Sequence, residues 1–128
     1  MTGEILFYGC IALLVLISVR RFFVNRSVTH YSVREVAERI QANRGVFLLD
    51  VRTEKEWRQG HIKGAHHIPL HELARRSSEL DKHRNREIIC YCQTGNRSVS
   101  AALRLRRFGF STASMKGGIA EWHFQNRG

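Results

Sequence analysis

One stretch of the chain joins a nucleophilic side chain to backbone that could activate it. Cys92 ends the apolar run 87–92 (EIICYC), and Gly95 separates that run from an amphipathic segment at 97–108. These patterns predict a buried strand, a short loop and a helix. A helix N-terminus presents unpaired N–H groups and a positive dipole end, which favour a cysteine thiolate and make the sulfur nucleophilic at neutral pH. The candidate active-site loop therefore consists of Cys92, Gln93, Thr94, Gly95, Asn96, Arg97 and Ser98.

Arg97 requires a negatively charged partner, because the helix dipole disfavours a cation in the first turn. That partner is either an anionic substrate or a carboxylate. Asp50 is a candidate carboxylate, since it lies near the end of a second apolar run, 46–51 (VFLLDV), and the carboxyl ends of parallel strands meet at one edge of a sheet. Asp50 and the nearby Arg52 are equally consistent with holding a loop in place. Both are therefore expected to support the site.

The remaining nucleophilic and metal-binding residue types predict no second site. Cys90 is interpreted as an inert core residue. The seven histidines include His66 and His67, whose side chains point to opposite sides of a strand, and no third ligand completes a metal set. The three cysteines include no Cys-x-x-Cys pair, which argues against zinc or a disulfide scaffold and favours a reducing compartment. Because Gly-x-Gly-x-x-Gly and P-loop motifs are also absent, we expect no metal and no cofactor.

Helical and strand-like patterns alternate from residue 25 onward. Ser32 and Glu35 form a capping box before a helical pattern that runs to about Gly45. Further helices are predicted at 53–58, 70–80, 97–108 and 119–124, and strands at 46–51, 65–69, 87–92 and 111–115. This alternation predicts an α/β fold with a mostly parallel sheet, which would place the 92–98 loop at its carboxyl edge.

The composition is that of one basic globular domain. The chain has 128 residues, of which 43% are hydrophobic and 25% are charged, and these values exclude disordered, collagen-like and multidomain classes. The net charge is +10 and most of it lies beyond residue 26, which suggests an anionic substrate or surface. The sequence has no aromatic-basic RNA-binding pattern and no zinc-finger spacing, so no nucleic acid partner is expected.

The N-terminus predicts a membrane anchor. Residues 5–19 (ILFYGCIALLVLISV) carry no charge, and Arg20, Arg21 and Arg26 follow. As a helix, this run spans about 22 Å of a hydrocarbon core roughly 30 Å thick, so flanking residues must extend it. The positive-inside rule predicts a single-pass protein of the inner membrane, with 1–26 as anchor and basic flank and the domain at 27–128 in the cytoplasm. A signal peptide and a buried or interfacial segment of a soluble protein are the alternatives.

Five motifs, in order along the chain, resemble those of single-domain rhodaneses. They are 48–52 (LLDVR), Glu56-Trp57 with 60–65 (GHIKGA), 68–70 (IPL), the 92–98 loop, and 117–119 (GGI) with Trp122. The similarity covers residues 29–122, and with the apolar N-terminus the chain resembles a membrane-tethered bacterial rhodanese. The resemblance implies a central five-stranded parallel sheet flanked by helices, and a persulfide on Cys92 cradled by residues 93–97. His67 departs from the family, which usually has Asn before Ile-Pro and a loop hydrogen bond there.

The chemistry of this family implies a sulfurtransferase. The Cys92 thiolate would attack the sulfane sulfur of a donor such as thiosulfate and expel sulfite, and a thiol or cyanide would remove the outer sulfur from the persulfide. This scheme needs no general base and predicts ping-pong kinetics. A membrane-tethered persulfide carrier or partner-docking module without turnover is the first alternative. A phosphatase or arsenate reductase is the second, but those enzymes have a Cys-x5-Arg loop, whereas four residues separate Cys92 from Arg97.

Overall fold

A parallel sheet of five strands forms the centre of the protein. The structure is a computed structural model that describes residues 1–126, the side chains of residues 24–26 excepted. The strand order is β1-β5-β4-β2-β3, and each neighbouring pair is parallel. The strands are β1 His30–Tyr31, β2 Val46–Asp50, β3 His66–His67, β4 Glu87–Tyr91 and β5 Thr112–Met115. The predicted α/β fold is confirmed, and so is the sheet that the family resemblance implies.

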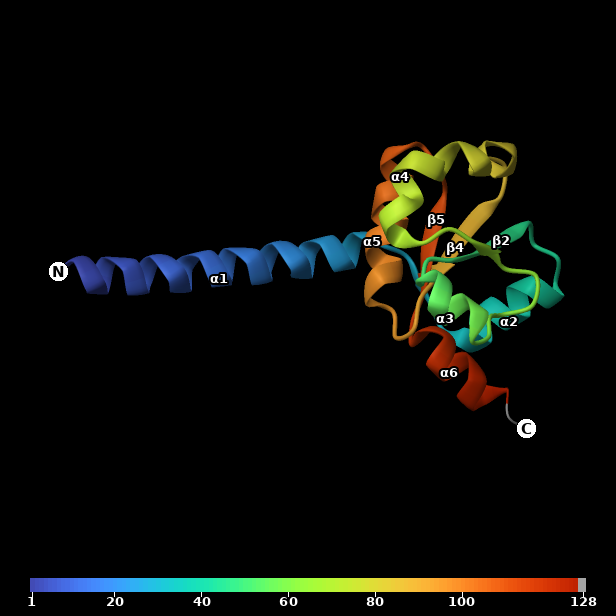
Figure 1. Cartoon of the computed structure of the whole chain (residues 1–128), viewed down its shortest axis with the longest axis horizontal. Helices are drawn as coiled ribbons and strands as arrows, with labels where there is room; N and C mark the ends of the chain where they lie inside the picture. The colour runs from blue at the N-terminus through green and yellow to red at the C-terminus, as the bar shows by residue number, and fades with distance from the viewer. Residues whose placement is uncertain (127–128) are drawn as a thin grey trace.

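Helices pack on both faces of this sheet (Figure 1). The helical segments are α1 Thr2–Ser27, α2 Val33–Gln41, α3 Glu54–Arg58, η1 Leu70–Glu72, α4 Leu73–Arg76, η2 Ser77–His83, α5 Asn96–Arg107 and α6 Gly118–Gln125. One core cluster lies between the sheet and the layer formed by α4, η2 and α5, and it includes Leu73, Leu80 and Leu105. A second cluster lies between the opposite face and helices α2 and α6, and it includes Val36 and Ile119.

Three elements differ from the sequence-based expectations. The segment after Pro69 is not one helix but the succession η1, α4 and η2, and it begins with Leu70 and Leu73 at a spacing of three, which suits 3-10 geometry. Helix α2 ends at Gln41 rather than near Gly45, because Asn43 adopts a left-handed conformation with φ +50°. Strand β1 has two residues and is too short to produce a recognisable pattern.

Alternation along the central strands decides which way each cysteine points. Leu49, Cys90 and Cys92 belong to the cluster beneath α5, whereas Leu48 and Ile89 belong to the opposite cluster. Side chains two residues apart on a strand lie on the same face of a sheet. Cys92 therefore leaves the carboxyl end of β4 on the side of α5, the helix that begins a few residues later.

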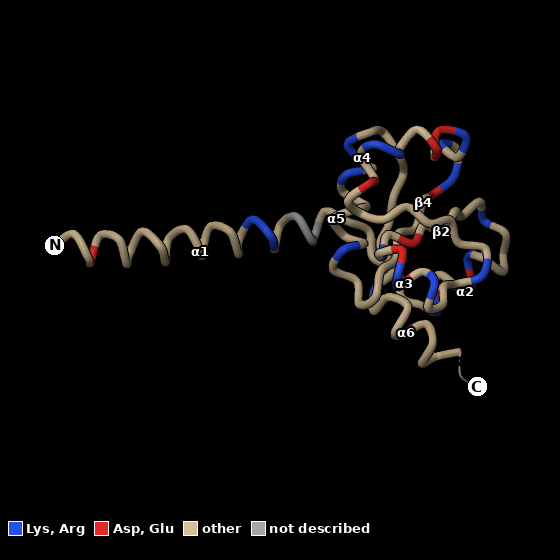
Figure 2. Tube along the Cα trace, in the orientation of Figure 1, with Lys and Arg blue, Asp and Glu red and all other residues tan. Residues whose placement is uncertain are grey.

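Helix α1 projects away from the domain, and its C-terminal end lies beside α5 (Figure 1). Its segment Thr2–Phe23 is long and apolar enough to cross a membrane, and none of it is buried in the protein. Figure 2 shows that charge is confined to the two ends of this helix, where Glu4 precedes the apolar run and Arg20 and Arg21 follow it. The Arg106 guanidinium of α5 donates a hydrogen bond to the Ser27 carbonyl at the end of α1.

Candidate active site

The candidate loop lies at the carboxyl edge of the sheet, where the chain leaves β4 and enters α5. β4 ends at Tyr91 and α5 begins at Asn96, so the connection is short. Gly95 precedes the helix with φ +112°, a conformation that side chains rarely adopt. This glycine reverses the chain so that the first turn of α5 faces back toward the sulfur. The strand, loop and helix predicted from the sequence are confirmed.

The Cys92 sulfur receives hydrogen bonds from the loop that surrounds it. The Gly95 N–H donates to Sγ over 3.0 Å, and the Ser98 Oγ lies 3.7 Å from Sγ. Burial of Cys92 would raise the pKa of its thiol, but hydrogen bonds from the Ser98 N–H and hydroxyl and from the N–H groups of Gly95 and Thr94 outweigh burial and lower that pKa. The loop therefore favours the thiolate, as the sequence predicts.

Helix α6 holds the other side of the same loop. The Ile119 N–H donates to the Cys92 carbonyl over 2.9 Å, and the Ala120 N–H donates to the Gln93 carbonyl over 3.2 Å. Gly118 lies so close to the loop that a Cβ atom there would meet the Cys92 carbonyl oxygen at 2.4 Å. Because the first turn of α6 binds the loop carbonyls, the loop N–H groups remain available to the sulfur. Sequence analysis identified the Gly117-Gly118 pair but not this contact.

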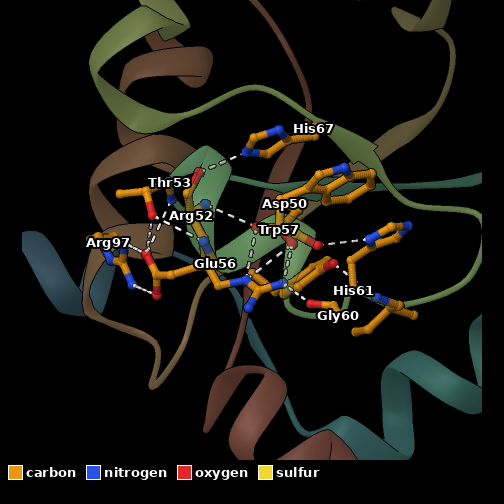
Figure 3. A network of polar contacts seen from close by, with 11 residues as sticks. Asp50, Arg52, Thr53, Glu56, Trp57, Gly60, His61, His67 and Arg97 are labelled. Atoms are coloured by element: carbon orange, nitrogen blue, oxygen red, sulfur yellow. Dashed lines mark hydrogen bonds and ion pairs between the residues drawn. The ribbon is translucent and has the colours of Figure 1, made fainter.

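Arg97 finds its carboxylate on α3, and that carboxylate is Glu56. The two Nη atoms of Arg97 donate to the two carboxylate oxygens of Glu56 over 2.6 and 2.8 Å (Figure 3). This bidentate contact, with burial opposing it and Thr53 adding further hydrogen bonds, lowers the pKa of Glu56 to about 2. Asp50, the candidate carboxylate named from the sequence, is not the partner of Arg97, because it forms an ion pair with Arg52. The signal for Glu56 was its place three residues after Thr53 in a capping box.

Asp50 and Arg52 form a buried ion pair that fixes the ends of α3. The exposed fractions of their side chains are 0% and 4%, and Nη2 of Arg52 lies 2.7 Å from Oδ2 of Asp50. The same Nη2 atom donates to the Gly60 carbonyl over 2.7 Å, beyond the end of α3. This is the loop-holding role that the sequence allowed. The pair supports the candidate site indirectly, because it fixes α3, and α3 carries the Glu56 side chain that holds Arg97.

The remaining predicted loop residues divide into two groups. Gln93, Thr94 and Asn96 are exposed at the surface of the loop, whereas Ser98 is fully buried beneath it. The buried Ser98 hydroxyl lies 2.8 Å from the hydroxyl of Ser114, a β5 residue that no sequence pattern singled out.

Cys90, His61 and His67 have surroundings that suit structural roles. Cys90 is fully buried, and burial raises the pKa of its thiol far above the usual range. His67 places Nε2 2.7 Å from the Arg52 carbonyl oxygen, so it supplies a loop hydrogen bond at the position where the rhodaneses that the sequence resembles usually have Asn. Trp57 stacks against His67 and His61 (Figure 3). Among residues 1–126, no three His, Cys, Asp or Glu side chains gather as a metal site.

Two hollows border the loop. The first has a volume of about 230 Å³ and is lined by Val51, Thr53, Pro69, Leu70, His71, Arg97 and Arg104. The second has a volume of about 360 Å³ and is lined by His30, Thr94, Gly95, Asn96, Val99, Lys116 and Gly117. Arg104 has no carboxylate within ion-pair distance in the part of the chain that the structure describes. The first hollow therefore offers an unpaired cation close to Arg97.

The sequence from residue 32 to residue 125 matches the family of rhodanese-like domains. The chain belongs to this family. The rhodanese-like domain is 32% identical over 101 residues to the thiosulfate sulfurtransferase GlpE of Shewanella oneidensis, across 78% of this chain and 97% of the relative. It is 29% identical over 100 residues to the putative sulfurtransferase YtwF of Bacillus subtilis, across 78% of this chain and 95% of that one. The family resemblance derived from the motifs is thus confirmed.

Sulfur carriers also occur among the relatives of this rhodanese-like domain. It is 32% identical over 97 residues to the putative sulfur carrier protein YrkF of Bacillus subtilis, across 75% of this chain and about half, 51%, of the relative. A rhodanese-related protein from Thermoplasma volcanium matches with a TM-score of 0.69 and 28% identity, over 77% of this chain and 93% of that chain. The protein is therefore a member of a family of sulfurtransferases and sulfur carriers.

Proposed function

We propose that the protein transfers sulfane sulfur through a persulfide on Cys92. The observation that carries this proposal is the hydrogen bond of 3.0 Å from the Gly95 N–H to the Cys92 sulfur, at the start of a helix and in a buried loop. Such a loop stabilises an anionic sulfur before and after it accepts a second sulfur atom. The proposal assigns Cys92 the catalytic role, residues 93–98 the cradle, and Asp50 and Arg52 the support of α3.

Each chemical step balances without a proton or a redox partner. The Cys92 thiolate attacks the outer sulfur of thiosulfate, a new sulfur–sulfur bond forms, and the bond to the departing sulfite breaks. The charge then resides on the terminal sulfur of the Cys92 persulfide. Cyanide or a thiolate attacks that sulfur, leaves as thiocyanate or as its own persulfide, and restores the Cys92 thiolate. No general base is needed, because the loop already favours the thiolate.

Intact mass measurement after incubation with thiosulfate tests this proposal. We expect one added sulfur atom on the protein, located on Cys92 by peptide mapping and removed again by cyanide. Cys92→Ser should gain none, and Cys90→Ala should gain one as the parent does. A sulfur atom added to the Cys92→Ser protein by thiosulfate would contradict the assignment.

A carrier without turnover is the second candidate, and the similarity to a putative sulfur carrier protein supports it. An enzyme and a carrier share the loading step, so they differ only in the fate of the loaded sulfur. Repeated formation of thiocyanate from thiosulfate and cyanide by a catalytic amount of protein would support the enzyme. A single round of loading without further turnover would support the carrier.

Phosphatase and arsenate reductase chemistry has less support than sulfur transfer. The loop is one residue shorter than a Cys-x5-Arg loop. In addition, both Nη atoms of Arg97 are engaged by Glu56, so the guanidinium is not free to bind a tetrahedral oxyanion.

We also propose that residues 5–19 form the centre of a single-pass anchor in the inner membrane, within an anchor and basic flank at 1–26. The support is a helix that is exposed from Thr2 to Phe23 and whose apolar run is followed by Arg20 and Arg21. Exposed apolar surface of this extent needs a partner, and a lipid bilayer is one that matches its length. The positive-inside rule then places the domain at 27–128 in the cytoplasm.

Membrane extraction and protease access test the anchor and its direction. Full-length protein should remain with membranes through high salt and alkaline washing, since these treatments release electrostatically attached proteins but not inserted helices. Protease added outside intact cells should leave the domain uncut. Recovery of a processed soluble form would identify the segment as a signal sequence instead.

A further inference from the structure

Two buried hydroxyl groups lie behind the Cys92 sulfur, and they come from different elements. Ser98 belongs to α5 and Ser114 to β5, and both residues are 0% exposed. Their Oγ atoms are 2.8 Å apart. Ser98 Oγ also lies 2.9 Å from the Gly95 carbonyl oxygen and 3.7 Å from the Cys92 sulfur. Ser98 thus stands between Ser114 and the reactive atom.

The number of hydroxyl protons decides which of the two serines donates the hydrogen bond to the other. Each hydroxyl has one proton to donate and two lone pairs to accept with. Within residues 1–126, the hydrogen-bond partner of the Ser114 hydroxyl is Ser98 Oγ. A buried hydroxyl is rarely left without an acceptor, so the Ser114 proton goes to Ser98. Ser98 then keeps its own proton for the Gly95 carbonyl oxygen or for the Cys92 sulfur.

We propose that Ser114 is a positioning residue for the Cys92 thiolate, because it donates to Ser98 and thereby directs the Ser98 hydroxyl proton toward the sulfur. A hydroxyl that accepts one hydrogen bond becomes a stronger donor of the next, and a charged sulfur attracts that proton more than a carbonyl does. The contact from β5 also keeps Ser98 in the rotamer that faces the loop. This inference rests on the proposed function, in which the Cys92 thiolate is the attacking group.

The charged and titratable groups around the sulfur do not depend on Ser114. Arg97 of α5 and Cys90 of β4 both interact electrostatically with Cys92, and the charge of Arg97 is balanced by Glu56 of α3. From α6 the loop receives backbone N–H groups, which carry no titratable proton near neutral pH. A change in the titration of Cys92 on removal of the Ser114 hydroxyl would therefore report the hydroxyl chain.

The test measures the rate of Cys92 alkylation by iodoacetamide against pH in the full chain. The exposed Cys10 is first replaced by serine, and peptide mass identifies the modified residue. Ser114→Ala should raise the midpoint by roughly half a pH unit to one unit, which is about a threefold to tenfold loss of thiolate at a fixed pH below it. Ser98→Ala should raise it at least as much, and Ser114→Thr, which keeps the hydroxyl, should restore the parent midpoint.

A double variant and a matched control make the outcome decisive. In the Ser98→Ala background, Ser114→Ala should cause no further shift, because Ser114 acts through Ser98. Thr112→Val is the control, since it removes a β5 hydroxyl that donates to the Ala102 carbonyl, away from the loop. An unchanged midpoint in folded Ser114→Ala protein would overturn the proposal, and so would an equal shift in the Ser98→Ala background. Alkylation does not involve sulfur transfer, so failure of the proposed function alone would leave this result intact.

Discussion

Replacement of Gly118 by alanine should displace the Cys92 loop without altering the cysteine itself. The added Cβ would lie 2.4 Å from the Cys92 carbonyl oxygen and 2.5 Å from the Gln93 carbonyl carbon. Cβ atoms essentially never approach another atom closer than 3.0 Å, so the two backbone segments must separate by at least about 0.6 Å. Both obstructing atoms belong to backbone, so no side chain can rotate away to make room.

The energetic cost has two parts. Gly118 has φ +62°, and a left-handed conformation costs an alanine roughly 1–2 kcal/mol. Separation of α6 from the loop also weakens the hydrogen bonds from Ile119 and Ala120, each of which contributes about 1 kcal/mol. We expect the free energy of unfolding to fall by roughly 2–4 kcal/mol. Because displacement of a reactive group by about 1 Å can cost a hundredfold in rate, sulfur loading should slow by about tenfold to a hundredfold.

Gly64→Ala is the matched control for this variant. Gly64 has φ +84°, so alanine there bears the same kind of conformational cost, but no atom lies within 4 Å of the added Cβ. We expect a loss of roughly 1–2 kcal/mol in stability and a loading rate within about twofold of the parent. Urea unfolding followed by circular dichroism gives the stabilities, and time-resolved intact mass after thiosulfate addition gives the rates. If the two variants lose equal stability and load sulfur equally fast, α6 does not position the loop.

Three further predictions concern the surroundings of the sulfur. Glu56→Gln should lower stability by roughly 1–3 kcal/mol at neutral pH, since it removes a bidentate charged contact from Arg97. The parent should lose this stabilisation as pH falls from about 4.5 toward about 2, because the folded-state pKa of Glu56 is depressed. The free energy of unfolding of the variant should not show this loss over the same pH range. Cys90→Ala should keep sulfur loading and lose stability through a small core cavity, and equal loss of loading in folded Cys90→Ala and Cys92→Ser would indicate a thiol pair. Arg104→Gln should raise KM for thiosulfate several-fold with little change in kcat, because this unpaired cation lines the hollow beside the loop and would attract the anionic substrate there. An unchanged KM would show that thiosulfate does not reach Cys92 through this hollow.

Patterns within short segments of the sequence were sufficient to predict the α/β class with a mostly parallel sheet and the reactive loop. The apolar runs that contain Asp50 and Cys92, the glycine after Cys92 and the capping box at Ser32 all depend on residues a few positions apart. Backbone propensity, burial and helix capping are local effects, so they can be inferred without knowledge of the tertiary contacts. The apolar N-terminal segment is equally local, and the structure shows it as one continuous helix.

Tertiary structure alone decided which groups surround the loop. Arg97 pairs with Glu56 across 41 positions of the sequence, whereas the sequence indicated Asp50 as the candidate carboxylate. Ser114 reaches Ser98 across 16 positions, and α6 binds the loop carbonyls through backbone N–H groups that any residue type provides. A requirement for an anion or a donor can be deduced from a residue and its place on a helix. The partner that meets the requirement depends on how distant elements pack, and local sequence patterns do not encode that packing.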